Sequence, residues 1–157
     1  MSKSRTRTRK FLFQMLFART YWEVNKDSLI ESFFEWIFSS ELDMEYADSV
    51  FNIILDKEQF LISLIKRFAS KFDISTMPKD VAFPIFIASA EMLFLEEAIP
   101  SSVSINEAVE LAKTYWDKSA KKLVNWVLDN ILDNIEEIKK EDTSIANSWF
   151  SFFKEIV

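Results

Sequence analysis

Residues 99–113 read IPSSVSINEAVELAK, and this stretch decides the fold. The residue before a proline resists the α-helical conformation, so the chain breaks at Ile99-Pro100 and a helix is predicted over 102–115. Apolar residues recur along it at helical spacing and predict its buried face. They are Ile105, Ala108, Val109 and Ala112.

The same helical period continues along nearly the whole chain, without the alternation of a strand. Helices are predicted over residues 6–21, 27–38, 44–71, 80–96, 102–115, 118–138 and 144–156. Charged residues 56–58 could divide the helix over 44–71 into two. Asp80 is expected to cap the helix over 80–96, and Pro84 is expected to lie in the first turn of that helix. Ser104 and Glu107 fit a capping box for the fifth helix, which could also begin two or three residues earlier. The pattern predicts an all-α bundle whose core contains the apolar stripes of the fourth to sixth helices.

The composition excludes most catalytic classes. The 157 residues include no Cys, no His and no Gly, which removes disulfides, thiolate and imidazole metal sites, and glycine-rich phosphate loops. A binding protein remains, or an enzyme that uses only carboxylates, Lys, Ser, Thr or Tyr. We expect no enzyme, no cofactor and no metal. The acidic cluster Asp43, Glu45 and Asp48 could serve a hydrolase, but near a helix start such acids more simply match the helix dipole.

Charge is divided unevenly along the chain. Residues 1–22 carry +6, whereas residues 23–157 carry −12. A basic N-terminal arm on an acidic body is typical of a protein that meets a polyanion at one end. Alternatively, the basic arm could be a solubilising tail, a juxtamembrane segment or a targeting segment. Because no run reaches 18 uncharged apolar residues, we expect no membrane span and a cytoplasmic protein.

Three motifs carry a resemblance to a known family. They are residues 99–113, the KLVNWVLD of residues 122–129, and the Arg9-Lys10-x-x-x-Gln14-Met15-Leu16-Phe17 opening. Together they resemble the signature of the transcription antitermination factor NusB family, which runs IPxxVAINEAVELAK, a spacer, then KFVNGVLD. The likeness spans residues 5–136 in the same order and spacing.

The resemblance implies a NusB-like helical bundle of about seven helices in two packed three-helix subdomains. Residues 1–138 would form the RNA-binding domain, and residues 139–157 a helical extension with no assigned role. The implied function is transcription antitermination on boxA-type single-stranded RNA in ribosomal RNA leaders. The implied partners are a small-subunit ribosomal protein that acts as Nus factor E and the RNA polymerase antitermination complex, with a homodimer as a further possibility.

Nine residues are predicted to contact RNA. They are Lys3, Arg5, Arg7, Arg9, Lys10, Gln14, Lys121, Lys122 and Asn125. The cations would neutralise phosphates, and the two amides would offer donors and acceptors to bases. Alternatively, Asn125 could form a cap or an inter-helix hydrogen bond, and the two lysines an ordinary solvated face. Asn106 and Glu107 are expected to be structural.

The chain departs from the family pattern at several positions. Phe86-Ile87 replaces a Leu-Arg pair, and Phe17 lacks the hydroxyl of the usual Tyr. Trp116 and Trp126 stand where the family has Gly, and the added bulk is expected to overpack. Together with the absence of glycine, this suggests the hypothesis that the source reads UGA as glycine. Genuine substitution in an A+T-rich genome is the alternative.

Two functions from other classes remain. A NusB-like domain also begins ribosomal RNA cytosine methyltransferases, so the chain could be an RNA-binding fragment of such an enzyme. It could also be a helical protein-interaction module whose basic arm docks an acidic partner.

Overall fold

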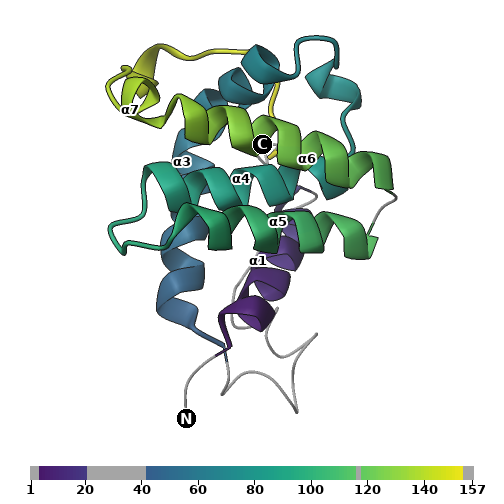
Figure 1. Cartoon of the computed structure of the whole chain (residues 1–157), viewed down its shortest axis with the longest axis vertical. Helices are drawn as coiled ribbons and strands as arrows, with labels where there is room; N and C mark the ends of the chain where they lie inside the picture. The colour runs from purple at the N-terminus through teal and green to yellow at the C-terminus, as the bar shows by residue number, and fades with distance from the viewer. Residues whose placement is uncertain (1–3, 21–41, 116–117, 154–157) are drawn as a thin grey trace.

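A computed structural model describes residues 4–20, 42–115 and 118–153, and within them the chain is helical without any strand (Figure 1). The α-helices are α1 (Arg5–Arg19), α3 (Met44–Phe68), α4 (Lys79–Leu93), α5 (Ser101–Tyr115), α6 (Lys118–Asp133) and α7 (Ile135–Ile138). Two short 3-10 helices are η2 (Ile74–Thr76) and η3 (Thr143–Ile145). The predicted all-α fold is confirmed, and the predicted helix over 27–38 lies outside the described residues.

Helix α4 is the centre of the molecule. Every residue from Val81 to Met92 is buried, and α4 contacts α1, α3, α5 and α6. Figure 1 shows α4, α5 and α6 running side by side, with α1 and α3 at a steep angle to them. Within the described residues, no helix combines the length and apolar character that crossing a bilayer requires.

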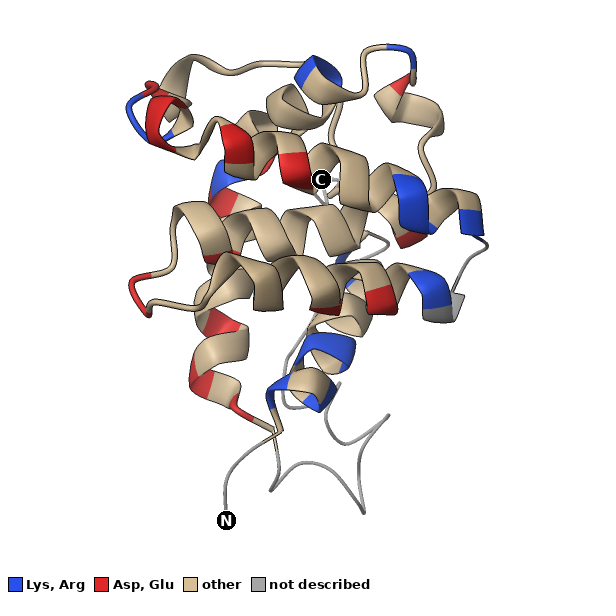
Figure 2. Ribbon diagram, in the orientation of Figure 1, with Lys and Arg blue, Asp and Glu red and all other residues tan. Residues whose placement is uncertain are grey.

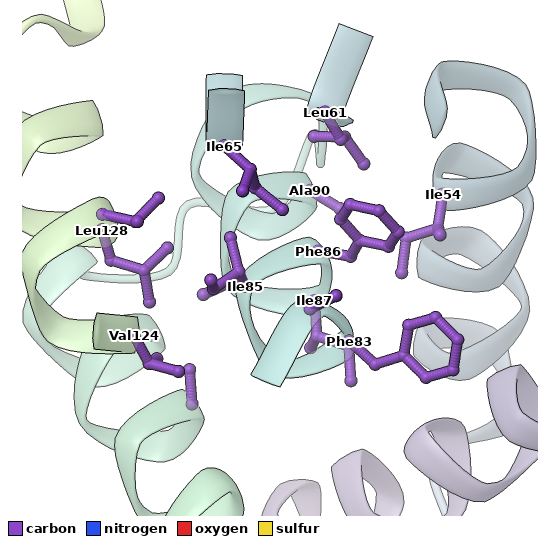
Figure 3. Packing of buried hydrophobic residues seen from close by; sticks show 14 of the residues in the cluster. Ile54, Leu61, Ile65, Phe83, Ile85, Phe86, Ile87, Ala90, Val124 and Leu128 are labelled. Atoms are coloured by element: carbon purple, nitrogen blue, oxygen red, sulfur yellow. The ribbon is translucent and has the colours of Figure 1, made fainter. Parts of the chain in front are cut away.

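The core forms on both sides of α4. In Figure 3, Ile85 and Phe86 lie between Ile54 of α3 and Leu128 of α6, and all four side chains are buried. Full burial of such a side chain contributes about 1.5–3 kcal/mol, so this layer holds the fold together. The predicted core stripes of α4, α5 and α6 are confirmed.

Polar side chains fix where the first helices begin. The Ser4 side chain accepts a hydrogen bond from the Arg7 N–H and caps α1. Asp43 does the same for α3, accepting from the Tyr46 N–H. Helix α3 then continues through residues 56–58 without a break, because the apolar face persists on both sides of the charged stretch.

Two predicted helix caps are wrong. Helix α4 begins at Lys79, so Asp80 lies in the first turn and Pro84 is its sixth residue, where proline removes a helical hydrogen bond. Helix α5 begins at Ser101, the earliest start considered. Ser104 is therefore inside α5, where its hydroxyl donates to Glu91 rather than closing a capping box.

The predicted helix over 144–156 is also wrong. After η3, residues 146–153 are not helical, and Trp149 has a φ of 61°. Phe152 and Phe153 are nevertheless buried and belong to the main core. The aromatic residues of this segment therefore fill the core from a non-helical backbone.

Trp126 does not overpack. Its side chain is 59% exposed on the outside of α6, and its Nε1–H donates to the Phe68 carbonyl oxygen at 2.8 Å. Trp116 lies outside the described residues. Trp149 is 94% exposed, and its positive φ is the backbone region that glycine enters without steric cost.

Candidate nucleic-acid interface

Helix α1 presents the first part of the predicted interface. Residues 7, 10 and 14 share one side of the helix by their spacing of three and four. Arg7 and Lys10 are exposed, whereas Gln14 is half-buried and its Oε1 atom is buried without a hydrogen-bond partner among the described residues. Lys3 lies outside the described residues.

Arg5 is held by the chain's own carboxylates. Its guanidinium binds Glu97 at 2.7 Å and Asp43 at 2.9 Å, and lies 4.2 Å from the centre of the Tyr46 ring. The hydrogen bond to Glu97 is the main cause that raises the pKa of Arg5. Arg5 therefore connects α1 to the start of α3 and to the loop before α5.

Arg9 lies at the centre of a buried polar network. Its side chain is 4% exposed, and its Nε and Nη2 atoms each donate to Glu91 at 2.8 Å. Tyr46 and Ser104 also donate to the Glu91 carboxylate. We call Arg9, Tyr46, Glu91 and Ser104 the Glu91 network; it joins α1, α3, α4 and α5 at one point.

The pKa values of Arg9 and Tyr46 are both raised within the Glu91 network. Burial is the largest single influence on the pKa of Arg9 and lowers it, but the hydrogen bonding to Glu91 and the electrostatic interactions with Tyr46, Glu91 and Glu107 together outweigh burial and raise the pKa. Burial and the Glu91 charge together raise the pKa of Tyr46, which keeps its phenol protonated as a donor. The guanidinium of Arg9 is thus committed inside the protein rather than presented at its surface.

A hollow of about 240 Å³ separates α1 from α5. It is lined by Thr6, Arg9, Lys10, Glu107, Glu110 and Leu111. The Thr6 hydroxyl donates to Glu107 at 2.9 Å, which holds the two helices together across the hollow. Glu107 is structural, as the sequence predicted, and its second role is a 3.9 Å contact with Arg9.

A second hollow of about 570 Å³ lies between α5 and α6, and we call it the α5–α6 hollow. It is lined by Asn106, Val109, Glu110, Lys113, Lys118, Lys121, Lys122 and Asn125. Among the described lining residues, four lysines and two amides thus lie around Val109, together with the carboxylate of Glu110. Glu110 lines both hollows, so the two are adjacent across α5.

The α5–α6 hollow brings together Lys121, Lys122 and Asn125 as predicted, but adds residues that sequence reasoning missed. Lys113 lies in the last turn of α5 and Lys118 is the first residue of α6, and both line the same hollow. Asn106 was expected to be structural, yet it is exposed and lines the hollow. The Asn125 amide donates to Asp129 at 3.1 Å within α6.

Basic residues gather at two places on the described part of the molecule. Figure 2 shows Lys and Arg on α1 and where α5 and α6 meet, with acidic residues of α5 beside them, and further acidic residues along the first part of α3 and in the loop between α4 and α5. Within the described residues, no group of acidic side chains has the arrangement of a metal site.

Comparisons with known proteins agree with this architecture. The family model described as "NusB family" matches residues 3–133. This chain belongs to the NusB family. The match covers α1 through α6 and stops before the segment that contains Phe152 and Phe153.

Individual NusB proteins are similar over nearly their whole length. The transcription antitermination protein NusB of Clostridium acetobutylicum is 32% identical over 138 residues, 86% of this chain and 96% of the relative. The transcription antitermination protein NusB of Dictyoglomus thermophilum is 34% identical over 139 residues, which are 88% of this chain and 91% of the relative. A solved structure of T. maritima NusB superposes with a TM-score of 0.69 at 27% identity, covering 91% of this chain and 95% of that one.

Proposed function

We propose that this NusB-family protein is a non-enzymatic, RNA-binding transcription antitermination factor. The observation that carries the proposal is the meeting of Lys113, Lys118, Lys121 and Lys122 at one hollow, beside the exposed cations of α1. Lysine ammonium groups bind phosphates as point charges, and each phosphate contact makes RNA affinity more dependent on salt.

The proposed path of the RNA starts on α1, crosses α5 and ends in the α5–α6 hollow. Arg7 and Lys10 would contact phosphates at the beginning of this path. The amides of Asn106 and Asn125 would meet base edges inside the hollow, where Val109 offers an apolar contact. Single-stranded RNA suits such a surface because its bases are free to turn toward the protein.

Arg5 and Arg9 take a different role in this proposal from the one predicted. Both guanidinium groups are already paired with carboxylates of α3, α4 or the loop before α5. We assign them to hold α1 against the bundle, so that Arg7 and Lys10 lie beside α5. The phosphate contacts then depend on the exposed cations, and Gln14 remains a candidate for a base contact.

The finer parts of the proposal come from the family resemblance. The RNA would be a boxA-type segment of ribosomal RNA leaders, bound in the cytoplasm together with a small-subunit ribosomal protein that acts as Nus factor E. The pair would act on RNA polymerase in the antitermination complex. The names of the relatives, all transcription antitermination proteins, support this assignment.

The test measures binding of fluorescently labelled boxA-type RNA and of a scrambled RNA with the same composition, with and without the ribosomal protein. We expect tighter binding to the boxA-type RNA by about tenfold or more, which corresponds to about 1.4 kcal/mol. The ribosomal protein should increase that ratio. Equal affinity for the two RNAs in both conditions would contradict the proposal and favour a general polyanion-binding or protein-docking surface.

A further inference from the structure

Residues 148–153 bind a face of α3 and α4 through their aromatic side chains. The Phe153 ring stacks on Phe83 with 5.5 Å between centroids and 10° between planes. The Phe152 ring meets Phe83 and Phe86 edge-on at 5.6 and 5.7 Å. Both rings are buried, so this contact removes a large apolar area from water.

Two side chains of α3 hold the backbone of the same segment. The buried Glu58 carboxylate accepts from the Ser151 hydroxyl at 2.5 Å and from the Phe152 N–H at 2.8 Å. Gln59 donates to the Phe150 carbonyl and accepts from the Ser148 N–H, both at 2.7 Å. A helix surface that offers both a donor and acceptors to a non-helical backbone has the chemistry of peptide recognition.

The segment is connected to the rest of the molecule by weak contacts. The family match ends at residue 133, and residues 139–147 lie mostly at the surface. The contacts of that connection include the exposed pair of Arg67 with Glu141, the half-buried hydrogen bond from Lys57 to Thr143, and the packing of Ala146 against the core. An exposed pair such as Arg67 with Glu141 contributes about 1 kcal/mol or less, so residues 139–147 act mainly as a tether for the segment that follows.

We propose that the face formed by Glu58, Gln59, Phe83 and Phe86 is a peptide-binding site whose present ligand is the chain's own C-terminal segment. The ligand class is a short non-helical peptide in which a serine precedes two aromatic residues, as in Ser151-Phe152-Phe153. The tether supplies this ligand at an effective concentration of about 1 mM, so a free peptide competes poorly in the intact chain. This site is separate from the proposed RNA path, and its failure would leave the RNA proposal unaffected.

The first experiment opens the site in the full-length chain with the double substitution Phe152→Ala and Phe153→Ala. A labelled synthetic peptide of residues 146–157 is then added and its fluorescence anisotropy is measured. We expect saturable binding to the variant, at least about tenfold tighter than to the unsubstituted chain. A peptide carrying the same two alanines is the matched control and should not bind.

Two results of that experiment would overturn the proposal. One is that the double variant keeps its helical structure and yet fails to bind the peptide at concentrations up to about 1 mM. The other is equal binding to the variant and the unsubstituted chain, which would place the peptide elsewhere on the surface.

If the double variant does not fold, amide hydrogen exchange on the unsubstituted chain still tests whether the C-terminal segment leaves its site while the rest of the chain stays folded. A tethered ligand leaves its site without global unfolding, so the Phe152 and Phe153 amides should exchange at least about tenfold faster than those of Ile87 and Ala88 in α4. Equal protection in the two places would show that the segment opens only when the whole chain unfolds. That result would overturn the proposal.

Discussion

Arg9 and Lys121 are both cations of the proposed RNA-binding side, yet they lie in opposite settings. Arg9 is enclosed by Glu91, Tyr46 and Glu107, and almost none of its side chain reaches solvent. Lys121 is exposed at the α5–α6 hollow among three other lysines. A buried pair costs much to break, whereas an exposed lysine contributes little to stability and is available to a phosphate.

The difference teaches that the number of basic residues in a segment overstates its capacity to bind an anion. The N-terminal arm contains more arginine than any other segment, but the guanidinium groups of Arg5 and Arg9 are paired with carboxylates of the protein itself. In the proposed function, the contacts with the anion therefore fall to the exposed lysines of α5 and α6, although residues 23–157 carry a net charge of −12.

The largest expected effect comes from two arginines that lie two residues apart on α1. Arg9→Ala leaves the Glu91 carboxylate buried without its cation, and such a loss costs about 3–5 kcal/mol of unfolding free energy. Arg7→Ala is the matched control, because Arg7 is exposed and alanine favours a helix. We expect its unfolding free energy to change by about 0.5 kcal/mol or less.

Urea denaturation measures both variants, and RNA binding completes the comparison for Arg7→Ala. That variant should bind RNA more weakly with a shallower dependence on salt. Equal free energies of unfolding for the two variants would contradict the conclusion that Arg9, unlike Arg7, stabilises the fold through the Glu91 network.

A second comparison concerns two exposed tryptophans in different backbone settings. Trp149→Gly should stabilise the chain by about 1 kcal/mol, because a side chain at positive φ is strained and glycine is not. Trp126→Gly should destabilise it by about 1 kcal/mol, because glycine weakens a helix interior and the bond to the Phe68 carbonyl is lost. Thermal unfolding of both variants checks this; a change of the same sign in both would contradict the structural account.

The hypothesis that UGA is read as glycine has a direct test. Peptide mass spectrometry of the protein isolated from its native source identifies the residues at positions 116 and 126. Glycine at both positions is the result that the hypothesis predicts, and tryptophan at 126 would refute it.

The smallest expected effect is the pH dependence of the exposed Arg5–Glu97 pair. Arg5 lowers the pKa of Glu97 below its usual 4.5. A carboxyl group with a lowered pKa stabilises the folded state above pH 4.5, and this contribution is lost as the pH falls through the folded pKa. We expect Glu97→Gln to cost about 1 kcal/mol or less at neutral pH and less still near pH 3, measured by urea denaturation. A cost that grows on acidification would contradict this assignment.

The helices could be predicted from the sequence because their signals are local. The apolar period, the Ile99-Pro100 break and the acid at Asp43 each act within a few residues of the helix that they specify. The conformation after Thr143 could not be predicted, because the burial of Phe152 and Phe153 depends on Phe83 and Glu58, far away in the chain. Tertiary packing there overrides a pattern that favours a helix.

The candidate site was predictable only in part, for the same reason. Lys121, Lys122 and Asn125 follow from a motif and from helical spacing, and they do lie together. The partner of Arg9 is Glu91, which is 82 residues away, so nothing near Arg9 in the sequence indicates that its charge is already neutralised. Lys113 and Lys118 join the hollow only because α5 and α6 fold back on each other.

The central claim is that the lysines of the α5–α6 hollow bind the RNA backbone. The most direct test compares the salt dependence of boxA-type RNA affinity in two double variants, Lys121→Ala/Lys122→Ala and Lys139→Ala/Lys140→Ala. The second pair is also exposed but follows α7, away from the hollow, and removes the same charge. If each lysine of the hollow contacts one phosphate, the first variant should shallow the slope of log affinity against log salt by about 1.4, and the second should leave it unchanged. Equal slopes in the two variants would contradict the claim.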